Sequence, residues 1–467
     1  MGMVKTIAVV TFAAGIAVGT TAFASDGGID PSFGVGGIAR AGITDGDDGP
    51  SGCKPRMQPD GKILICGTRL ANGATGSDFL VARFNVDGSL DTSFGSGGLA
   101  TIDFDNGRGG DHAEGIALLA DGRIVVAGTT HGIGLQSDDF AIARLSADGS
   151  LDHGFAGTGK ATIAFNLDNG VGNDDVHALA LEPDGTIIVA GSAETLDGSV
   201  VAVARLLDDG ARDAAFNQTG KVTFDFGPGE TDDARGIAVD EKGRIVIAGT
   251  ARQPGAQDSA EFGVARLLST GELDTSFNGT GFTTIAFDPG SGTSNAMATG
   301  LTSLRGGDIL ISGYANTSPW AMQNMDMAVA RLQTNGSPVA AFGTNGQLVI
   351  PFDLEIDGFD AALDAIEQPD GRLLLVGTAL SDTTQYAVVA RVTREGAPDL
   401  SFGTTGRASY DLGFTTPGTQ VFTGVTMQGT QIIAGGIAFL PPLGSPQSLD
   451  CLLVRLHNDS IYADGFE

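Results

Sequence analysis

Carboxylates are the residues of this 467-residue sequence whose number and spacing suggest chemistry, and that chemistry is the binding of a divalent cation. Segments rich in Asp, Asn and Gly recur at 45–49, 103–111, 166–175, 225–233 and 353–360. Calcium takes about six to eight oxygen ligands in flexible geometry, and Asp side chains and loop carbonyls supply such ligands. The candidate calcium ligands are Asp45, Asp47, Asp103, Asp105, Asp168, Asp174, Asp232 and Asp357.

A second set of carboxylates stands five residues before a recurring arginine. Its members are Asp78, Asp139, Glu261, Asp326 and Asp450, with Val200 and Tyr386 at the remaining positions. We expect both sets at one end of the fold, where like charges repel unless water, salt or a cation screens them. The segment 103–114 approaches EF-hand spacing but lacks the glycine at the sixth position. A solvated acidic face is therefore the alternative to calcium, and no cofactor is certain.

Other reactive groups form no catalytic pattern in the sequence. The five histidines occupy no repeated register, and no histidine has an HxH or HxxxH partner. The sequence contains no GxSxG element around a serine, no P-loop, and no GxGxxG motif between a strand and a helix. We expect no catalytic residues, and a hydrolase or dehydrogenase on a propeller scaffold stays the alternative.

Three cysteines, an odd number, leave at least one thiol outside any internal disulfide. Cys451 lies in the last repeat, which a closed ring sets beside the first. We expect a disulfide between Cys451 and either Cys53 or Cys66 that locks ring closure. The alternative is three buried thiols that act as small apolar residues.

Internal repetition shows which elements must position these residues. A recurring phenylalanine is separated by 61, 61, 61, 61, 65 and 60 residues, at Phe33, Phe94, Phe155, Phe216, Phe277, Phe342 and Phe402. A turn such as PDGKILICGT and the arginine of motifs such as VARL keep the same register. The chain therefore contains seven copies of one structural unit.

Each unit contains four predicted strands, which in the second unit are LATIDF, EGIALLA, RIVVAGT and FAIARLS. The middle strands are apolar at both parities, so both of their faces should be covered. Four-stranded sheets that pack between two neighbours form a closed ring. We predict an all-β, seven-bladed β-propeller with four antiparallel strands per blade, because a parallel β-helix has a much shorter repeat and lacks these hairpin turns.

The run PDGKILICGT followed by FLVARFNVDGSLDTSFGSGG resembles the delta-60 repeat family of bacterial proteins. The resemblance covers about residues 29 to 457 and implies an exported, propeller-like repeat protein without an assigned reaction. It supplies no catalytic residues. The unit around Phe342 departs from the family pattern because Val339 replaces its aspartate, and the unit around Gly429 reads MQGTQ.

The recurring arginine, aspartate and phenylalanine suggest a structural fastener. A guanidinium inside a sheet needs a partner, because a buried charge without one costs several kcal/mol. We expect the arginine and aspartate to meet at each blade junction and the phenylalanine to fill the gap between blades. The residues of four complete sets are Arg83, Asp91 and Phe94; Arg144, Asp152 and Phe155; Arg205, Asp213 and Phe216; and Arg266, Asp274 and Phe277.

The strand order also sorts the loops into two ends of the ring. The PDG and LDTSFG turns share one end, while the loops that vary in length share the other, so a ligand site is expected at the variable end. The expected partner is a protein or a glycan. A net charge of -30 argues against binding to nucleic acid.

The chain ends complete the expected organisation. Residues 1–24 have the pattern of a secretory signal peptide, 25–460 form the propeller, and 461–467 are a short tail. We expect no transmembrane segment once the signal is removed, and a secreted, periplasmic or cell-surface location. These features indicate an exported binding or surface-interaction module, with a propeller enzyme and a purely structural envelope protein as alternatives.

Overall fold

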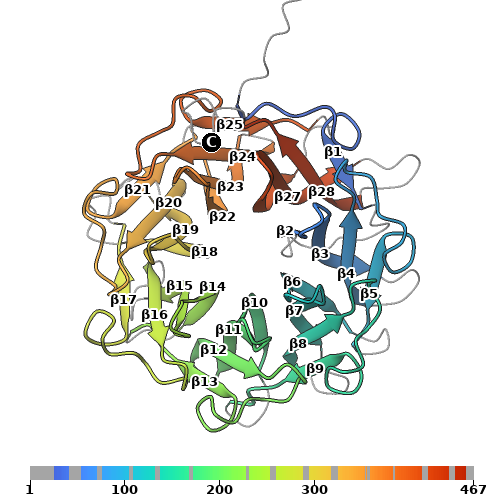
Figure 1. Ribbon diagram of the computed structural model, residues 1–467. Helices are drawn as coiled ribbons and strands as arrows, with labels where there is room; N and C mark the ends of the chain where they lie inside the picture. Colours follow the sequence, from blue (N-terminus) through green and yellow to red (C-terminus); the bar gives the residue numbers. More distant parts are fainter. Residues whose placement is uncertain are drawn as a thin grey trace, which may run out of the picture.

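Apolar strands separated by glycine-containing turns build every sheet of this protein. In the computed structural model, seven four-stranded antiparallel sheets surround a central axis and form a seven-bladed β-propeller (Figure 1). The middle strands are buried because a neighbouring blade covers each sheet face, as for β7 (Ile124–His131), in which only the last residue is exposed. The structure describes residues 26–41, 54–70, 76–104, 109–131, 137–167, 172–227, 231–252, 259–287, 294–316, 324–352, 354, 358–381, 384–412, 419–440 and 448–458.

The blades are numbered along the chain, and their strands are given from the innermost to the outermost. Blade 1 contains β2 (Pro55–Met57), β3 (Ile63–Leu70), β4 (Ser77–Phe84) and β5 (Leu99–Ile102); blade 2 contains β6 (Asp111–Leu118), β7 (Ile124–His131), β8 (Asp138–Leu145) and β9 (Lys160–Ile163); blade 3 contains β10 (Asp174–Leu181), β11 (Ile187–Thr195), β12 (Gly198–Leu206) and β13 (Lys221–Phe224); blade 4 contains β14 (Asp232–Val239), β15 (Ile245–Arg252), β16 (Ala260–Leu267) and β17 (Phe282–Ile285). Blade 5 contains β18 (Ala296–Ser303), β19 (Ile309–Asn316), β20 (Met325–Leu332) and β21 (Gln347–Ile350); blade 6 contains β22 (Asp360–Glu367), β23 (Leu373–Leu380), β24 (Gln385–Val392) and β25 (Arg407–Tyr410); blade 7 contains β26 (Gln420–Gln428), β27 (Gln431–Leu440), β28 (Ser448–Leu456) and β1 (Ile38–Arg40).

The expected fold is confirmed, but the expected grouping of strands within a unit is wrong by one strand. The strand predicted to open the second unit is β5, and it pairs with β4 as the outer strand of blade 1. The LDTSFG phrase therefore lies in a hairpin within a blade and does not link two blades. Because the shift is one whole strand, the assignment of turns to the two ends of the ring does not change.

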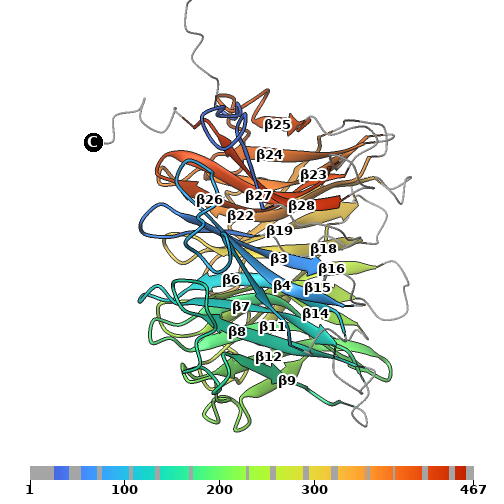
Figure 2. The ribbon, with the colours of Figure 1, turned by 90° about the vertical axis from the view of Figure 1, so that its right-hand side faces the viewer.

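The two ends of the ring differ in their connections. We call the end with the DG turns and the LDTSFG hairpins the repeat face, and the opposite end the variable face. At the variable face the second strands end, the third strands begin, and each outer strand leads to the next blade. Figure 2 shows the hairpin turns of the repeat face gathered at one end of the molecule. No helix within the described residues could span a membrane.

The N-terminal segment closes the ring. Strand β1 pairs antiparallel with β28, so blade 7 takes its outer strand from the beginning of the chain. Gly27 N–H donates to His457 O, and His457 N–H donates to Gly28 O, both at 2.8 Å. The chain ends therefore replace the hairpin that joins the third and outer strands in the other blades. The predicted signal peptide (1–24) and tail (461–467) lie outside the described residues.

Each complete junction between blades repeats the same polar contacts. In blade 1, Arg83 Nε donates to Asp91 Oδ2 at 2.7 Å, and the guanidinium carbon lies 4.5 Å from the centre of the Phe94 ring. Arg83 Nη1 also donates to Ala147 O of blade 2 at 2.5 Å. The same Arg–Asp pair forms at Arg144 with Asp152, Arg205 with Asp213, Arg266 with Asp274, Arg391 with Asp399 and Arg455 with Asp30. One arginine thus connects the hairpin of its own blade to the turn of the next.

In blade 5 the recurring arginine pairs with a carboxylate at a different position. Val339 stands where the other units have aspartate, and Arg331 Nη2 instead pairs with Asp308 Oδ2 at 2.8 Å. Asp308 follows the turn between β18 and β19, where Lys62 and Arg123 stand in blades 1 and 2. The negative charge has therefore moved from the hairpin to the turn, and the buried arginine keeps a partner.

Candidate metal centre

From blade 2 to blade 7, a side chain at or just before the start of each inner strand accepts a hydrogen bond from a backbone N–H of the segment that arrives from the previous blade. In blade 2 this residue is Asp111, which is fully buried and accepts the Phe104 N–H at 2.7 Å through Oδ2. Asp174, Asp232 and Asp360 accept the corresponding N–H groups of Phe165, Phe226 and Phe352. Ser294 and Gln420 accept those of Phe287 and Leu412. The carboxylate of Asp111 therefore belongs to a structural position that the repeat needs.

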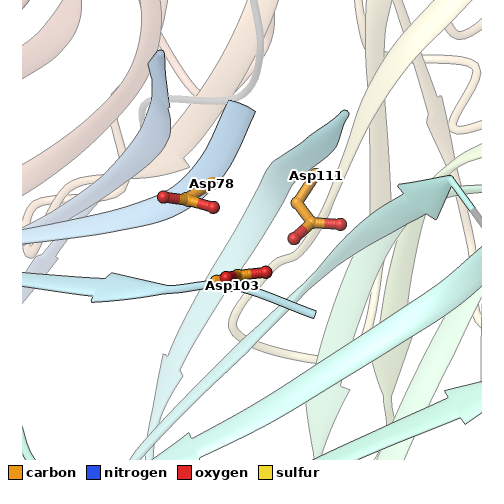
Figure 3. Close-up of side chains that lie close together, drawn as sticks. All are labelled: Asp78, Asp103 and Asp111. Atoms are coloured by element: carbon orange, nitrogen blue, oxygen red, sulfur yellow. The ribbon is translucent and has the colours of Figure 1, made fainter. Parts of the chain in front are cut away.

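Two further carboxylates approach Asp111 from blade 1. Ser77 forms a parallel bridge with Gly110, which sets the start of β4 beside the start of β6, and Asp78 follows Ser77. Asp103 follows β5, one residue before Phe104. One carboxylate oxygen from each of Asp78, Asp103 and Asp111 lies within 4.8 Å of the others. Figure 3 shows the three side chains close together, with Asp78 on β4, Asp111 on β6 and Asp103 directly after β5. Three oxygen donors at this separation could share one hard cation.

The neighbouring charge is compatible with such a site. The Lys160 ammonium of blade 2 donates to the backbone oxygen of Asp103 at 2.6 Å and lies 5.6 Å from the Phe104 ring centre. The same lysine-to-backbone hydrogen bond occurs one blade further on, where Lys221 Nζ donates to Ala164 O at 2.7 Å. Lys160 therefore has a structural role at the backbone of Asp103.

Among the junctions that the structure describes, the triad occurs only between blades 1 and 2. The register of the sheets identifies the residues that correspond to Asp78, Asp103 and Asp111 at five other described junctions. Each of those sets has a carboxylate missing from at least one position: Asp139, Ala164 and Asp174; Val200, Asp225 and Asp232; Glu261, Ala286 and Ala296; Asp326, Pro351 and Asp360; Tyr386, Asp411 and Gln420. The fold does not require three carboxylates at this place.

Burial makes negative charge costly at these inner-strand positions. Burial raises the pKa of Asp174 to about 6, and the Asp139 carboxylate adds to the effect. Burial likewise raises the pKa of Asp232 to about 6. Binding of a proton or of a cation offsets the cost of a buried negative charge at this position. Where three carboxylates meet at one junction, a bound cation would offset more of this cost.

The structure brings together only part of the candidate calcium set. Asp103 lies in the triad, together with Asp78 from the second set and Asp111, which ends the acidic segment 103–111. Asp174 and Asp232 fix links between blades and do not join a described cluster of three ligands. The candidates Asp45, Asp47, Asp105, Asp168 and Asp357 lie outside the described residues.

The variable face also holds a histidine–carboxylate pair that the sequence did not indicate. His131 Nδ1 lies 2.6 Å from Asp138 Oδ1, and these residues are directly opposite each other on β7 and β8. Asp138 N–H donates to Asn173 Oδ1 at 3.1 Å, which connects the pair to blade 3. The only sequence signal for this pair is that His131 and Asp138 stand at the two ends of the connection between β7 and β8.

The cysteines fall into two groups. Cys451 on β28 is disulfide-bonded, whereas Cys66 on β3 is a buried thiol whose pKa burial raises to about 12. Cys53 lies outside the described residues, so the pairing of Cys451 with Cys53 stays a prediction.

Comparison with known families agrees with the repeat architecture. Five segments match the family described as "Domain of unknown function (DUF5122) beta-propeller", at residues 58–94, 119–155, 182–216, 243–277 and 368–402. Each segment ends on the recurring phenylalanine of its unit. The two units without a match are the one with Val339 and the one divided between the chain ends. The chain is a β-propeller repeat protein.

Solved structures show a similar fold at low identity. They include a protein of unknown function from Dyadobacter fermentans, with 14% identity, a TM-score of 0.45 and coverage of 74% of this chain and 95% of that chain. Polysaccharide lyase Uly1 shares 12% identity, with a TM-score of 0.48 and coverage of 89% and 92%. The GH93 α-L-arabinofuranosidase of Fusarium graminearum shares 12% identity, with a TM-score of 0.42 and coverage of 73% and 91%. No curated protein sequence matches this chain.

Proposed function

We propose that this protein is an exported binding module that engages a protein or a glycan through its variable face. The observation that carries this proposal is the carboxylate triad of Asp78, Asp103 and Asp111 on that face. The repeat face contains similar fasteners in successive blades, while the triad occurs at one of the junctions that the structure describes. A feature that the scaffold does not need is a better guide to function than one that every blade repeats.

Calcium is the cation that this site would hold. The three carboxylates are hard oxygen donors, and three such donors leave room for the carbonyl, water or ligand oxygens that calcium also takes. A cation that keeps open coordination positions can bridge the triad to hydroxyl or carboxylate oxygens of a glycan or protein. Calcium binding and ligand binding would then be coupled.

The proposed location and family rest on the sequence. The signal-like residues 1–24 support export to the periplasm, the medium or the cell surface. The repeated phrase supports membership of the delta-60 repeat family within the broader group of β-propeller repeat proteins. Both fit a protein whose net charge of -30 favours solubility in an extracellular compartment.

The calcium prediction is tested by thermal melting in chelator, in millimolar calcium and in equal magnesium. A ligand that binds only the folded ring stabilises it by RT ln(1 + [L]/Kd), about 2.7 kcal/mol at 100 times Kd. We expect calcium to raise the melting temperature and magnesium to raise it less, because magnesium demands stricter geometry and gives up water reluctantly.

A matched pair of variants separates the triad from general charge effects. Asp103→Asn removes one candidate ligand, whereas Asp225→Asn makes the same change at the corresponding position of blade 3, where Val200 leaves no triad. The Asp103 variant should lose the calcium effect, and the Asp225 variant should keep it. Equal melting temperatures of the wild type in chelator and in calcium would leave the solvated acidic face as the correct interpretation.

A propeller enzyme is the second candidate, and the His131–Asp138 pair favours it. A histidine held by a carboxylate can act as a general base if a substrate proton lies within reach. His131→Gln should then abolish turnover of a bound glycan while leaving its binding intact. Binding without turnover in the wild-type protein would favour the binding module.

A further inference from the structure

An apolar cavity of about 250 Å³ lies between blades 5 and 6, which are neighbours in the ring (Figure 1). Blade 5 contributes β21 and the residue after it. Blade 6 contributes the end of β24, the hairpin that follows it and the start of β25. The lining side chains are mainly apolar and include Leu348, Ile350, Pro351, Val392, Pro398 and Leu400.

Smaller residues in blade 6 leave this space open. Pro398 stands at a hairpin position where three other units have leucine. Those leucines, which pack against the apolar cluster shared with the preceding blade, are Leu90, Leu151 and Leu273. Val392 is likewise smaller than the leucine or phenylalanine that ends the third strand of the other blades. Blade 5 also has a hairpin proline, Pro338, but it keeps Leu332. The junction of blades 5 and 6 therefore lacks apolar volume that other junctions fill.

Two exposed apolar side chains extend the cavity onto the surface. Leu400 is 76% exposed and Val349 is 36% exposed, and both line the cavity. The other units have no large aliphatic residue at the position of Leu400, where they carry Pro31, Thr92, His153, Ala214, Thr275 and Ala340. At the position of Val349, five other outer strands carry hydroxyl side chains, namely Thr101, Thr162, Thr223, Thr284 and Ser409. The repeat does not need these apolar groups, and exposed apolar surface beside a cavity is typical of a docking site.

Arg407 adds a positive charge to the wall of the cavity. Its guanidinium carbon lies 5.9 Å from the centre of the Phe352 ring. Among the described residues, no ion pair or hydrogen bond engages this guanidinium. Lys160 and Lys221, which open the outer strands of blades 2 and 3, instead donate to the backbone of the previous blade. Arg407 can therefore pair with a carboxylate that enters the cavity.

The described chain ends close to this cavity. Its last residue is Asn458, whose Oδ1 accepts a hydrogen bond from Arg391 Nη1 at 2.5 Å. Arg391 Nε donates to Asp399 Oδ2 at 2.6 Å, and both sequence neighbours of Asp399 line the cavity. The sequence continues for nine residues, 459–467. A segment of this length spans up to roughly 30 Å when extended, which is enough to reach the cavity.

The composition of segment 459–467 complements the cavity. It contains no basic residue, and its large apolar and acidic residues are Ile461, Tyr462 and Phe466, and Asp459, Asp464 and Glu467. Apolar side chains fit the aliphatic walls, and a carboxylate fits Arg407. Because the segment is covalently attached, its effective concentration at the cavity is about millimolar, so weak contacts suffice to hold it.

We propose that segment 459–467 docks in the cavity between blades 5 and 6, with an aromatic side chain among the apolar walls and a carboxylate on Arg407. The docked segment covers Val349 and Leu400 and holds the end of the sequence against the repeat scaffold. This proposal depends neither on the calcium triad nor on a ligand at the variable face.

The test is photo-cross-linking in the full chain. The photoreactive residue p-benzoylphenylalanine takes the place of Phe466 in one variant and of Tyr462 in another, and peptide mapping locates the attachment. We expect a cross-link within one chain to residues 348–351 or 396–407. A covalent dimer would assign the cavity to a second copy of the chain. That result, attachment elsewhere or the absence of a cross-link would overturn the proposal.

A double variant, Val349→Thr with Leu400→Thr, tests the cavity itself, because it installs residue types that other units carry. Docking should weaken about tenfold, equivalent to about 1.4 kcal/mol, and the cross-link yield should fall. Leu196→Thr is the matched control, since Leu196 is 79% exposed in the β11–β12 turn of the variable face. It should keep the wild-type yield. Equal yields in the double variant and the control would contradict docking in this cavity.

Thermal melting checks that the variants fold. If the double variant does not fold, Arg407→Gln gives a second route, because it installs the residue that opens the outer strand of blade 5. This change removes the charge that the carboxylate needs, so the cross-link yield should again fall. An unchanged yield in Arg407→Gln would exclude the proposed ion pair.

Discussion

At the scale of single residues, one buried arginine holds several segments of the ring at once. Arg391, which is fully buried, donates to Asp399 at 2.6 Å, to Asp26 at 2.8 Å and to Asn458 at 2.5 Å. Its guanidinium carbon also lies 4.8 Å from the Phe402 ring centre. A guanidinium can be buried only when such partners offset its desolvation. Arg391 therefore joins both ends of the chain to blade 6.

Phe155→Ala tests the apolar part of the fastener. Phe155 is fully buried and packs against Gly210 in the turn of the next blade, where a φ of +85° and the close ring exclude a side chain. Removing a buried aromatic ring should lower the free energy of unfolding by about 3 to 5 kcal/mol. Urea unfolding measures the change, and His153→Ala in the same hairpin is the exposed control. A wild-type midpoint for Phe155→Ala would remove the ring from this account.

Asp308 and Val339 test the relocated charge of blade 5. Asp308→Ala leaves the buried Arg331 without its carboxylate partner and should cost about 3 to 5 kcal/mol. Adding Val339→Asp should recover much of this loss, because it supplies the carboxylate at the position that the other units use. A double-mutant cycle in urea measures the coupling. Strictly additive effects would show that the two positions do not serve the same arginine.

At the scale of elements, repetition predicts the blade but not where one blade stops. The spacing of Phe94, Phe155 and Phe216 requires a four-strand unit, yet any four consecutive strands of a repeated meander satisfy that spacing. Only the long-range pairing of β1 with β28 shows which four strands form one blade. Local signals cannot contain this information because the two strands lie at opposite ends of the chain.

The same limit applies to the candidate metal centre. Asp78 and Asp103 could be assigned to the variable end from strand order, because each stands at a strand terminus. Their approach to Asp111 depends on the bridge between Ser77 and Gly110, which joins a strand to an inter-blade link. Loop geometry of this kind has no periodic sequence signal. The choice of one junction among those described therefore required the structure.

Removal of residues 26–41 tests ring closure at the level of a whole element. The shortened chain loses β1, Arg455 loses its carboxylate partner Asp30, and Arg391 loses Asp26 but keeps Asp399. We expect loss of cooperative unfolding, because an open sheet edge remains and the largely buried Arg455 has lost its carboxylate. A synthetic peptide of residues 26–41 should restore the melting transition, and the same peptide with Phe33→Ala should not. Cooperative melting of the shortened chain without peptide would contradict this role of β1.

At the scale of the whole molecule, the propeller separates its positive charges from its negative excess. The recurring arginines are enclosed between blades, whereas many carboxylates stand at the variable face, in a chain with a net charge of -30. The buried arginines therefore stabilise the ring without neutralising its exterior. A long-range field of this sign disfavours anionic partners at the surface and attracts cations to the variable face.

The pH dependence of ring stability is set by two opposing kinds of buried group. Asp174 has a pKa of about 6 in the folded chain, above its unfolded value, so its favourable contribution is full below pH 4 and disappears as the pH rises to about 6. His177 has a pKa of about 3, below its unfolded value, so its contribution is full above about pH 6.5 and is lost as the pH falls. These slopes oppose each other, and the wild-type profile between pH 4.5 and 7.5 should be shallow.

Single variants should reveal how each group changes the free energy of unfolding with pH. Relative to the wild type, Asp174→Asn should gain stability as the pH rises from 4.5 to 7.5, because the wild type must then ionise a buried carboxyl. His177→Gln should gain stability relative to the wild type as the pH falls, because the wild type then opposes protonation of the imidazole. Urea unfolding in about 0.5 M NaCl, where the Debye length is only a few ångströms, separates these effects from surface charge. Parallel profiles for the wild type and both variants would show that neither group titrates differently on folding, and the ring would then owe its pH response to the exposed carboxylates alone.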